Sequence, residues 1–90
     1  MRNTIVIDCK GIGTEAEFWD RYIDAIPPDT RRNFGRNLDA FNDALAGGPG
    51  WPGDVDVQFL NAASLSGIRD GDFVRALKEI TAQSEQVTFS

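Results

Sequence analysis

The sequence contains no histidine. This absence removes the commonest general base and the commonest metal ligand of proteins, and with them every catalytic triad built on histidine. The chain has a single cysteine, Cys9, so it cannot form an internal disulfide. Because no histidine can activate this thiol, we expect Cys9 to be a small buried or half-buried side chain rather than a nucleophile. Together these absences exclude the many enzyme mechanisms that depend on histidine.

Long apolar segments are also missing. No run approaches the roughly 20 apolar residues that a membrane-spanning helix needs, and Met1 leads into a strand-like segment without a signal-peptide pattern. We therefore expect a soluble, cytoplasmic protein. Acidic residues outnumber basic ones by 14 to 9, which gives a formal charge of −5. Such a charge repels nucleic acid and anionic membranes and attracts a basic protein.

Motifs that hold phosphates, metals or cofactors are absent as well. No glycine-rich phosphate loop follows a strand, and no acidic cluster has metal-ligand spacing. Asp70-Gly71-Asp72 is the nearest approach to a calcium loop, but the rest of the twelve-residue ligand pattern is missing. We expect an aspartate of this group to cap the following helix instead. The sequence therefore predicts neither a metal site nor a cofactor.

The 90 residues are enough for one domain, spanning 1–90, in which strand-like and helix-like segments alternate. β-Branched and apolar runs predict three strands, over 4–9, 55–60 and 86–89. The first strand is apolar enough to be covered on both faces. Helical spacing predicts three helices, over 14–26, 33–45 and 70–80, with a linker over 29–32 and a loop over 61–67. This order predicts an α/β fold with a small three-stranded parallel sheet and right-handed helical crossovers.

The helix ends carry recognisable signals. Thr14 and Glu17 have the form of a capping box, in which the hydroxyl and the carboxylate each satisfy a backbone amide. Either Asn33 or Asn37 can cap the second helix, with Gly35 giving the backbone latitude between them. The first helix should end at Pro27-Pro28, because proline cannot donate to the helical ladder. Its large aromatic residues are expected in the core: Trp19 and Tyr22.

The segment 33–45 combines a core face with an acidic face. Its apolar residues fall in one helical stripe: Phe34, Leu38, Phe41 and Leu45. Asp39 and Asp43 lie four residues apart on roughly the opposite side, with Arg36 beside them. Like charges at this spacing repel, and Asp43 is near the helix C-terminus, where an anion costs a few tenths to about 1 kcal/mol. Stability alone would not select this pair.

Periodicity leaves two interpretations of the acidic pair open. The face is either an incidental solvated surface or a recognition surface for a basic protein. Acid–base catalysis by Asp39 and Asp43 is disfavoured, because an open helix face offers no apolar pocket to raise the pKa of one carboxyl. The Gly/Pro loop over 46–53 follows, and its tryptophan, Trp51, either folds back on the core or belongs to the same binding surface.

The segment 34–45 resembles the signature of the barstar family, the intracellular inhibitors of secreted guanyl-specific microbial ribonucleases. In this chain the pattern of an aromatic residue, Gly, any residue, then Asn-Leu-Asp-Ala and Asp-Ala-Leu occupies Phe34 to Leu45. The first strand, the helix that follows it and the segment Leu77-Lys78-Glu79 are similar to the family in placement. The resemblance implies a barstar-like fold and an inhibitor rather than an enzyme.

The resemblance also assigns roles to residues. In the family, the helix and the loop before it plug the ribonuclease active site, and the residue matching Asp43 takes the place of the substrate phosphate. Asp39 would reach basic groups on the guanine side, and Glu79 would add a peripheral ion pair. The residues expected to contact the partner are Asn33, Phe34, Gly35, Arg36, Asp39, Asn42, Asp43, Gly47, Trp51 and Glu79. The expected complex is 1:1, with a monomeric free form.

Three departures from the family bear on the identity of the target. The best-known member has aromatic residues at the positions of Asn33, Asn42 and Gly48. The apolar contacts that flank the acidic pair are therefore reduced, although Trp51 offers a replacement for one of them. An immunity or regulatory protein that binds another basic toxin or enzyme is the alternative interpretation.

Overall fold

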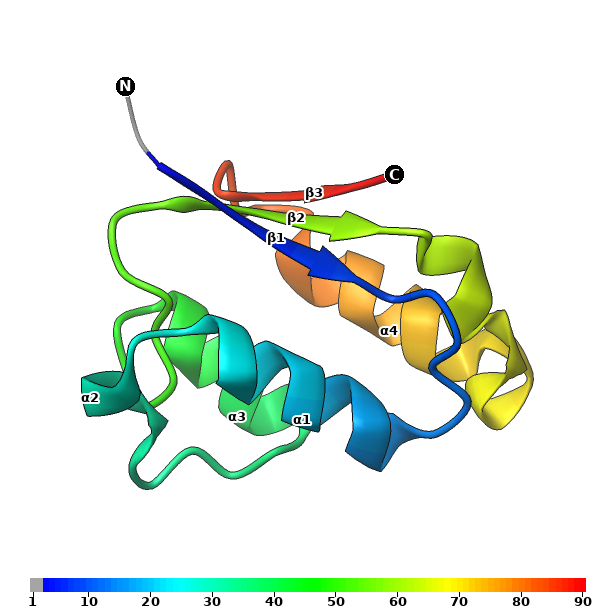
Figure 1. Ribbon diagram of the computed structural model, residues 1–90, viewed down its shortest axis with the longest axis horizontal. Helices are drawn as coiled ribbons and strands as arrows, with labels where there is room; N and C mark the ends of the chain where they lie inside the picture. Colours follow the sequence, from blue (N-terminus) through cyan, green and yellow to red (C-terminus); the bar gives the residue numbers. More distant parts are fainter. Residues whose placement is uncertain (1–2) are drawn as a thin grey trace.

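The computed structural model describes residues 3–90, and a three-stranded parallel sheet lies along one side of it (Figure 1). Strand β1 (Thr4–Asp8) pairs with β2 (Asp56–Leu60), which pairs with β3 (Val87–Phe89). In this register Thr4 lies opposite Asp56, and Val57 lies opposite Val87. The predicted α/β fold with a small parallel sheet is confirmed.

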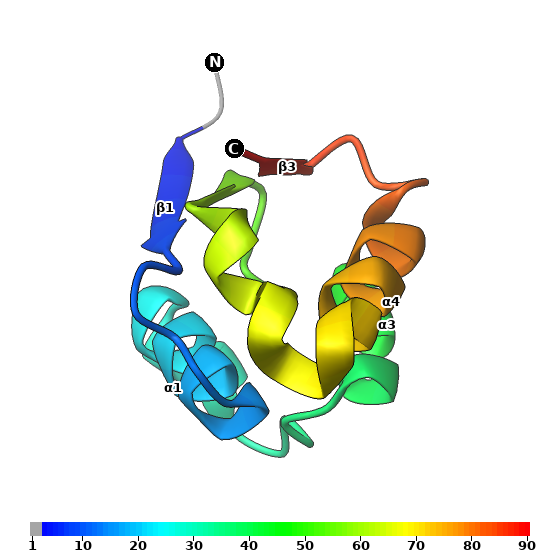
Figure 2. The same ribbon diagram turned by 90° about the vertical axis from the view of Figure 1, so that its right-hand side faces the viewer.

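The helical elements lie on one side of the sheet (Figures 1 and 2). They are α1 (Glu15–Ala25), α2 (Pro28–Arg31), α3 (Leu38–Leu45), the 3-10 segment η1 (Ala62–Gly71) and α4 (Asp72–Thr81). The prediction that the first strand is covered on both faces is wrong. Ile7 points into the core and is 3% exposed, whereas Val6 lies on the open face and is 52% exposed.

Helix α1 forms as its end signals predict. The Thr14 side-chain oxygen accepts a hydrogen bond from the Glu17 amide at 3.2 Å. The Glu17 carboxylate accepts its bond at 3.1 Å from the Thr14 hydroxyl rather than from a backbone amide, so only the Thr14 half of the capping box is confirmed. The helix ends at Ala25, ahead of the two prolines. The second of these, Pro28, begins the short helix α2, because proline is well tolerated at a first helical position. The prediction that 29–32 is only a linker is therefore wrong.

The segment after β2 is more helical than predicted. Instead of a loop over 61–67, η1 runs as a 3-10 segment that is broken at residues 68–70. Helix α4 follows, and the residue before it is Gly71 with φ 89°, a conformation that glycine adopts without strain. No side chain caps this helix, so the prediction of an aspartate cap is wrong. Asp72 is instead its first residue and pairs with Arg75 at 2.6 Å.

An aromatic cluster joins α1 and α3 to the sheet. The ring centroid of Trp19 lies 5.7 Å from those of both Phe34 and Phe41. Phe41 in turn lies 6.5 Å from Phe59 of β2. Trp19 and Tyr22 are 1% and 0% exposed, so their predicted core positions are confirmed. These ring contacts hold α3 against α1 and the sheet.

Cys9, just after β1, is fully buried. Burial raises the pKa of its thiol to about 11, so the thiol is protonated at neutral pH. The prediction of a small buried side chain is confirmed. In the described range 3–90, no helix is long and apolar enough to cross a membrane.

Candidate partner-binding surface

The acidic helix begins later than its periodicity predicts. The Asn37 side-chain oxygen accepts a hydrogen bond from the Ala40 amide at 2.7 Å, so Asn37 rather than Asn33 is the N-cap of α3. Residues 33–36 form a loop in which Asn33 and Arg36 have φ values of 66° and 54°. The positive φ falls on these two residues and not on Gly35. The helical part of the segment 33–45 is therefore Leu38–Leu45.

Gly35 is nevertheless confined by its neighbours. A Cβ atom at this position would lie 3.1 Å from the Cβ of Ala40, which is closer than ordinary van der Waals contact. The entry loop therefore packs directly against the first turn of α3. A side chain at this position would require the Ala40 side chain or the loop to shift by a few tenths of an ångström.

The predicted core face of α3 is confirmed, because its residues are buried or partly buried. Phe41 and Ala44 are fully buried, while Leu38 and Leu45 are partly buried against the core. Phe34 belongs to the same core but reaches it from the entry loop, and it is 9% exposed. Its side chain therefore presents little surface to a partner.

The opposite face of α3 is acidic and open. Asp39 and Asp43 are both exposed, and neither takes part in an ion pair within residues 3–90. At the i, i+4 spacing their side chains project from one side of the helix. Arg36, predicted beside them on the helix, lies in the entry loop before α3, and its guanidinium pairs with Asp20 of α1 at 2.7 Å. Arg36, the only cation among the predicted site residues, is therefore paired with a residue of α1.

Asn42 lies next to the acidic pair and faces α4. It lines a groove of about 240 Å³ between the two helices, with Leu45 and Ala46 of the α3 end and Ile80, Gln83 and Ser84 of the α4 end. Glu79 is exposed on α4, directly before Ile80. The structure thus places Asn42 and Glu79 on neighbouring helices, as a combined surface requires.

The glycines after α3 shape its C-terminal turn. The Asp43 carbonyl accepts hydrogen bonds from the amides of Ala46 and Gly48 at 3.1 and 2.9 Å. Gly47 is exposed and has φ 104°, a conformation that disfavours other residues. A Cβ at Gly48 would lie 2.9 Å from the Asp43 carbonyl oxygen, so the backbone would have to shift. Sequence reasoning missed this requirement at Gly48, although the Gly-Gly pair directly after the helix was a visible signal.

The rest of the Gly/Pro loop is held against the core by Gly50. Its amide donates to the Thr30 carbonyl at 2.6 Å, and its carbonyl accepts from the Tyr22 hydroxyl at 2.7 Å. A Cβ at Gly50 would clash with the Phe34 ring, so this position accepts only glycine in the present packing. Trp51 follows and is 37% exposed, outside the core cluster. Trp51 is therefore not a member of the core cluster, and its part in a binding surface stays a prediction.

The surface lacks the features of a metal or catalytic site. No group of three or more acidic or cysteine side chains is arranged to hold a metal ion in the part of the chain from 3 to 90. Asp39 and Asp43 stand on an open helix face, where water competes for every hydrogen bond. Their arrangement suits recognition of cationic groups presented by another molecule.

Comparison with known protein families agrees with this fold. A family model described as Barstar (barnase inhibitor) matches residues 2–88. The chain belongs to this family. The match covers β1, β2 and all four α-helices and reaches into β3, so it is not confined to the acidic segment. Members of the family are inhibitors and not enzymes. No curated protein matches the chain.

Proposed function

We propose that this protein inhibits a secreted, guanyl-specific microbial ribonuclease by filling its basic active site with the acidic face of α3. One observation carries the proposal: Asp39 and Asp43 are exposed, and no cation pairs with either within residues 3–90. Three arginines elsewhere pair with carboxylates, and none of them belongs to this face. The two carboxylates are therefore available to the arginine and histidine side chains that bind substrate phosphate in such an enzyme.

The chemistry of this contact is strong when water is excluded. Carboxylate–guanidinium hydrogen bonds are charge-assisted and can be bidentate. In the proposed complex Asp43 takes the place of the phosphate, Asp39 reaches the guanine side, and Glu79 adds an ion pair from α4. The net charge of −5 attracts a basic enzyme over distances of about 10 Å at moderate salt. Association is therefore expected to slow as salt is added.

The residues near the acidic pair are expected to determine which ribonuclease the protein binds. Asn42, next to the acidic pair, lines a groove between α3 and α4, and positions 33, 42 and 48 carry Asn, Asn and Gly rather than aromatic residues. Aromatic anchors commonly dominate interface energies. We therefore expect a target whose contacts with this chain depend more on charge than on apolar packing. The proposal includes a 1:1 complex and a cytoplasmic, monomeric free protein.

The test is a titration of ribonuclease activity against a panel of secreted guanyl-specific ribonucleases. Addition of one equivalent of this protein should abolish the activity of at least one enzyme, with a sharp break at equal concentrations. Size-exclusion chromatography with light scattering should then give the mass of a 1:1 complex. Failure to inhibit any member of a broad panel would contradict the proposal.

The replaced aromatic positions also favour a second candidate partner. Because Asn33, Asn42 and Gly48 depart from the best-known member of the family, the same acidic surface could serve as an immunity protein against another basic toxin or enzyme. Affinity capture from the secreted proteins and lysate of the producing cell separates the two. Recovery of a basic protein without ribonuclease activity would favour this second function.

A further inference from the structure

The entry loop before α3, residues 33–36, is anchored on both sides of Arg36. On one side the Phe34 ring lies in the core, with its centroid 5.7 Å from that of Trp19. On the other side Asn37 caps α3, and its side-chain nitrogen donates to the Gly35 carbonyl at 3.2 Å. The backbone conformation of Arg36 therefore affects the path by which the chain enters the acidic helix.

Arg36 has an unfavourable backbone conformation and a tie to α1. Its φ is 54°, in the left-handed region that disfavours any residue with a Cβ atom. Its guanidinium pairs with Asp20 at 2.7 Å. Within residues 3–90 this is the only ion pair that the entry loop makes. Because unfavourable backbone conformations persist only where their surroundings hold them, the pair with α1 is well placed to hold this one.

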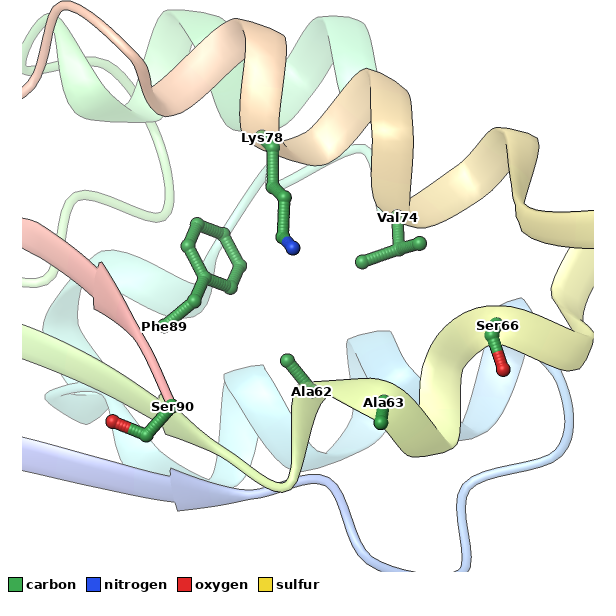
Figure 3. Close-up of a pocket in the computed structure, with 7 residues that line it drawn as sticks. All are labelled: Ala62, Ala63, Ser66, Val74, Lys78, Phe89 and Ser90. Carbon is green, nitrogen blue, oxygen red and sulfur yellow. The ribbon is translucent and has the colours of Figure 1, made fainter.

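The same pair offsets a positive charge inside the proposed contact surface. An unpaired Arg36 would face a basic enzyme with a charge of the wrong sign. Lys78, which precedes Glu79 on α4, is also turned elsewhere: it extends into a hollow between η1, α4 and the end of β3, 5.7 Å from the centroid of the Phe89 ring (Figure 3). No residue of α3 lines that hollow. Within residues 3–90, neither cation pairs with Asp39 or Asp43.

We propose that Asp20 is a positioning residue for partner binding and that it acts through Arg36. The ion pair holds the entry loop against α1 in the form that meets the ribonuclease, and it neutralises the Arg36 charge there. Asp20 itself lies on α1, outside the residues predicted to contact the partner. If the loop takes its docking form only part of the time, the apparent affinity falls in proportion. This role rests on the proposed function, because it concerns the same partner and the same surface.

The first measurement separates association from dissociation. Stopped-flow kinetics with the inhibited ribonuclease compare Asp20→Asn with Asp24→Asn, which removes the charge of an exposed aspartate on the same helix. Asp24 makes no ion pair within residues 3–90, so this control reports only the change in net charge. The association rate constant of Asp20→Asn should be about threefold to fivefold below that of the control, in the upper part of the range for an exposed ion pair. The dissociation rate constant should be unchanged, because the partner holds the loop once the complex has formed.

The second measurement asks whether Asp20 acts through Arg36. In a chain that already carries Arg36→Gln, Asp20 has no guanidinium to hold. Asp20→Asn should then slow association no more than Asp24→Asn does. An effect of Asp20→Asn that persists in this background, or that appears in the dissociation rate, would show that Asp20 contacts the enzyme directly and would overturn the proposal.

The third measurement needs no ribonuclease. NMR relaxation of the backbone amides of residues 33–36 reports the mobility of the loop in the protein alone. Mobility should increase in Asp20→Asn and in Arg36→Gln but not in Asp24→Asn, and the same spectra show whether each variant is folded. An entry loop that is unchanged in folded Asp20→Asn, or an association rate equal to that of the control, would overturn the proposal. If the unmodified protein inhibits no ribonuclease, the proposed function fails, and the relaxation data still decide whether Asp20 holds the loop.

Discussion

Helices α1 and α3 both carry acidic side chains but use them differently. On α1, the Glu15 carboxylate accepts a hydrogen bond from the Trp19 indole at 3.1 Å and pairs with Arg69. On α3, Asp39 and Asp43 are exposed and make no ion pair within residues 3–90. The acid of α1 therefore satisfies a buried donor and ties η1 to α1. The acids of α3 do neither, which leaves them free for a partner.

The largest expected effect is on binding. Asp43→Ala should weaken the complex with the target ribonuclease by about 2–5 kcal/mol, because it leaves cationic groups of the enzyme desolvated without a partner. The measurement is the inhibition constant from activity titrations. Asp24→Ala is the matched control, since Asp24 is an exposed aspartate on a different helix, α1. Asp20 is less suitable because it holds Arg36 of the entry loop. Equal losses in the Asp43 and Asp24 variants would remove the distinction between the two helices.

The next effect is on folding. Glu15→Ala should lower the free energy of unfolding by about 1–3 kcal/mol, because the Trp19 indole N–H loses its acceptor in a residue that is 1% exposed. Chemical denaturation measures this change. Glu15→Gln keeps an acceptor oxygen but removes the charge that pairs with Arg69, so it should recover part of the loss. Both variants should still inhibit the target, and a Glu15→Gln that is as unstable as Glu15→Ala would assign the effect to the ion pair.

Removing the charge at one end of α3 or the other should change the free energy of unfolding by small amounts of opposite sign. Asp43 lies in the last turn, where the helix dipole disfavours an anion, and Asp39 lies in the first turn, where it favours one. Asp43→Asn should therefore raise the free energy of unfolding by a few tenths to about 1 kcal/mol, and Asp39→Asn should lower it by a similar amount. Denaturation at low salt measures both. A loss of stability in Asp43→Asn would mean that this aspartate serves the fold.

The smallest effect concerns the exposed ion pair between the loop and α1. The side chains of Arg36 and Asp20 are 57% and 60% exposed, and pairs of this kind contribute only about 0–1 kcal/mol. Asp20→Asn should therefore change the free energy of unfolding far less than Glu15→Ala does. A large loss in thermal or chemical denaturation would show that the whole fold, and not only the entry loop, depends on this pair.

The elements were predictable where local chemistry and packing agree. The capping residue Thr14, the two prolines after α1 and the alternation in β2 determine their elements with short-range signals, and the structure confirms them. Pattern also identified the buried stripe of Phe41 and its neighbours. The open outer face at Val6 was not predictable, because an apolar run does not say which side of a sheet the helices cover.

Tertiary contacts decided the features that local patterns missed. Arg36 was expected beside Asp39, but the left-handed backbone at this residue directs its side chain to Asp20 of α1. Gly48 packs against the Asp43 carbonyl, a contact that depends on the path of the turn and that no local pattern predicts. Spacing and motif predicted the acidic pair, but only the structure shows that neither carboxylate makes an ion pair within residues 3–90.

The most direct test of the central claim is a double-mutant cycle between Asp43 and an active-site arginine of the inhibited ribonuclease. Dissociation constants are measured for the four combinations of unmodified proteins, Asp43→Ala and the arginine-to-alanine enzyme. If Asp43 occupies the substrate-phosphate position, the coupling energy should be about 1–3 kcal/mol or more, and the cycle made with Asp24→Ala should give about zero. A coupling energy near zero for Asp43 would contradict the account.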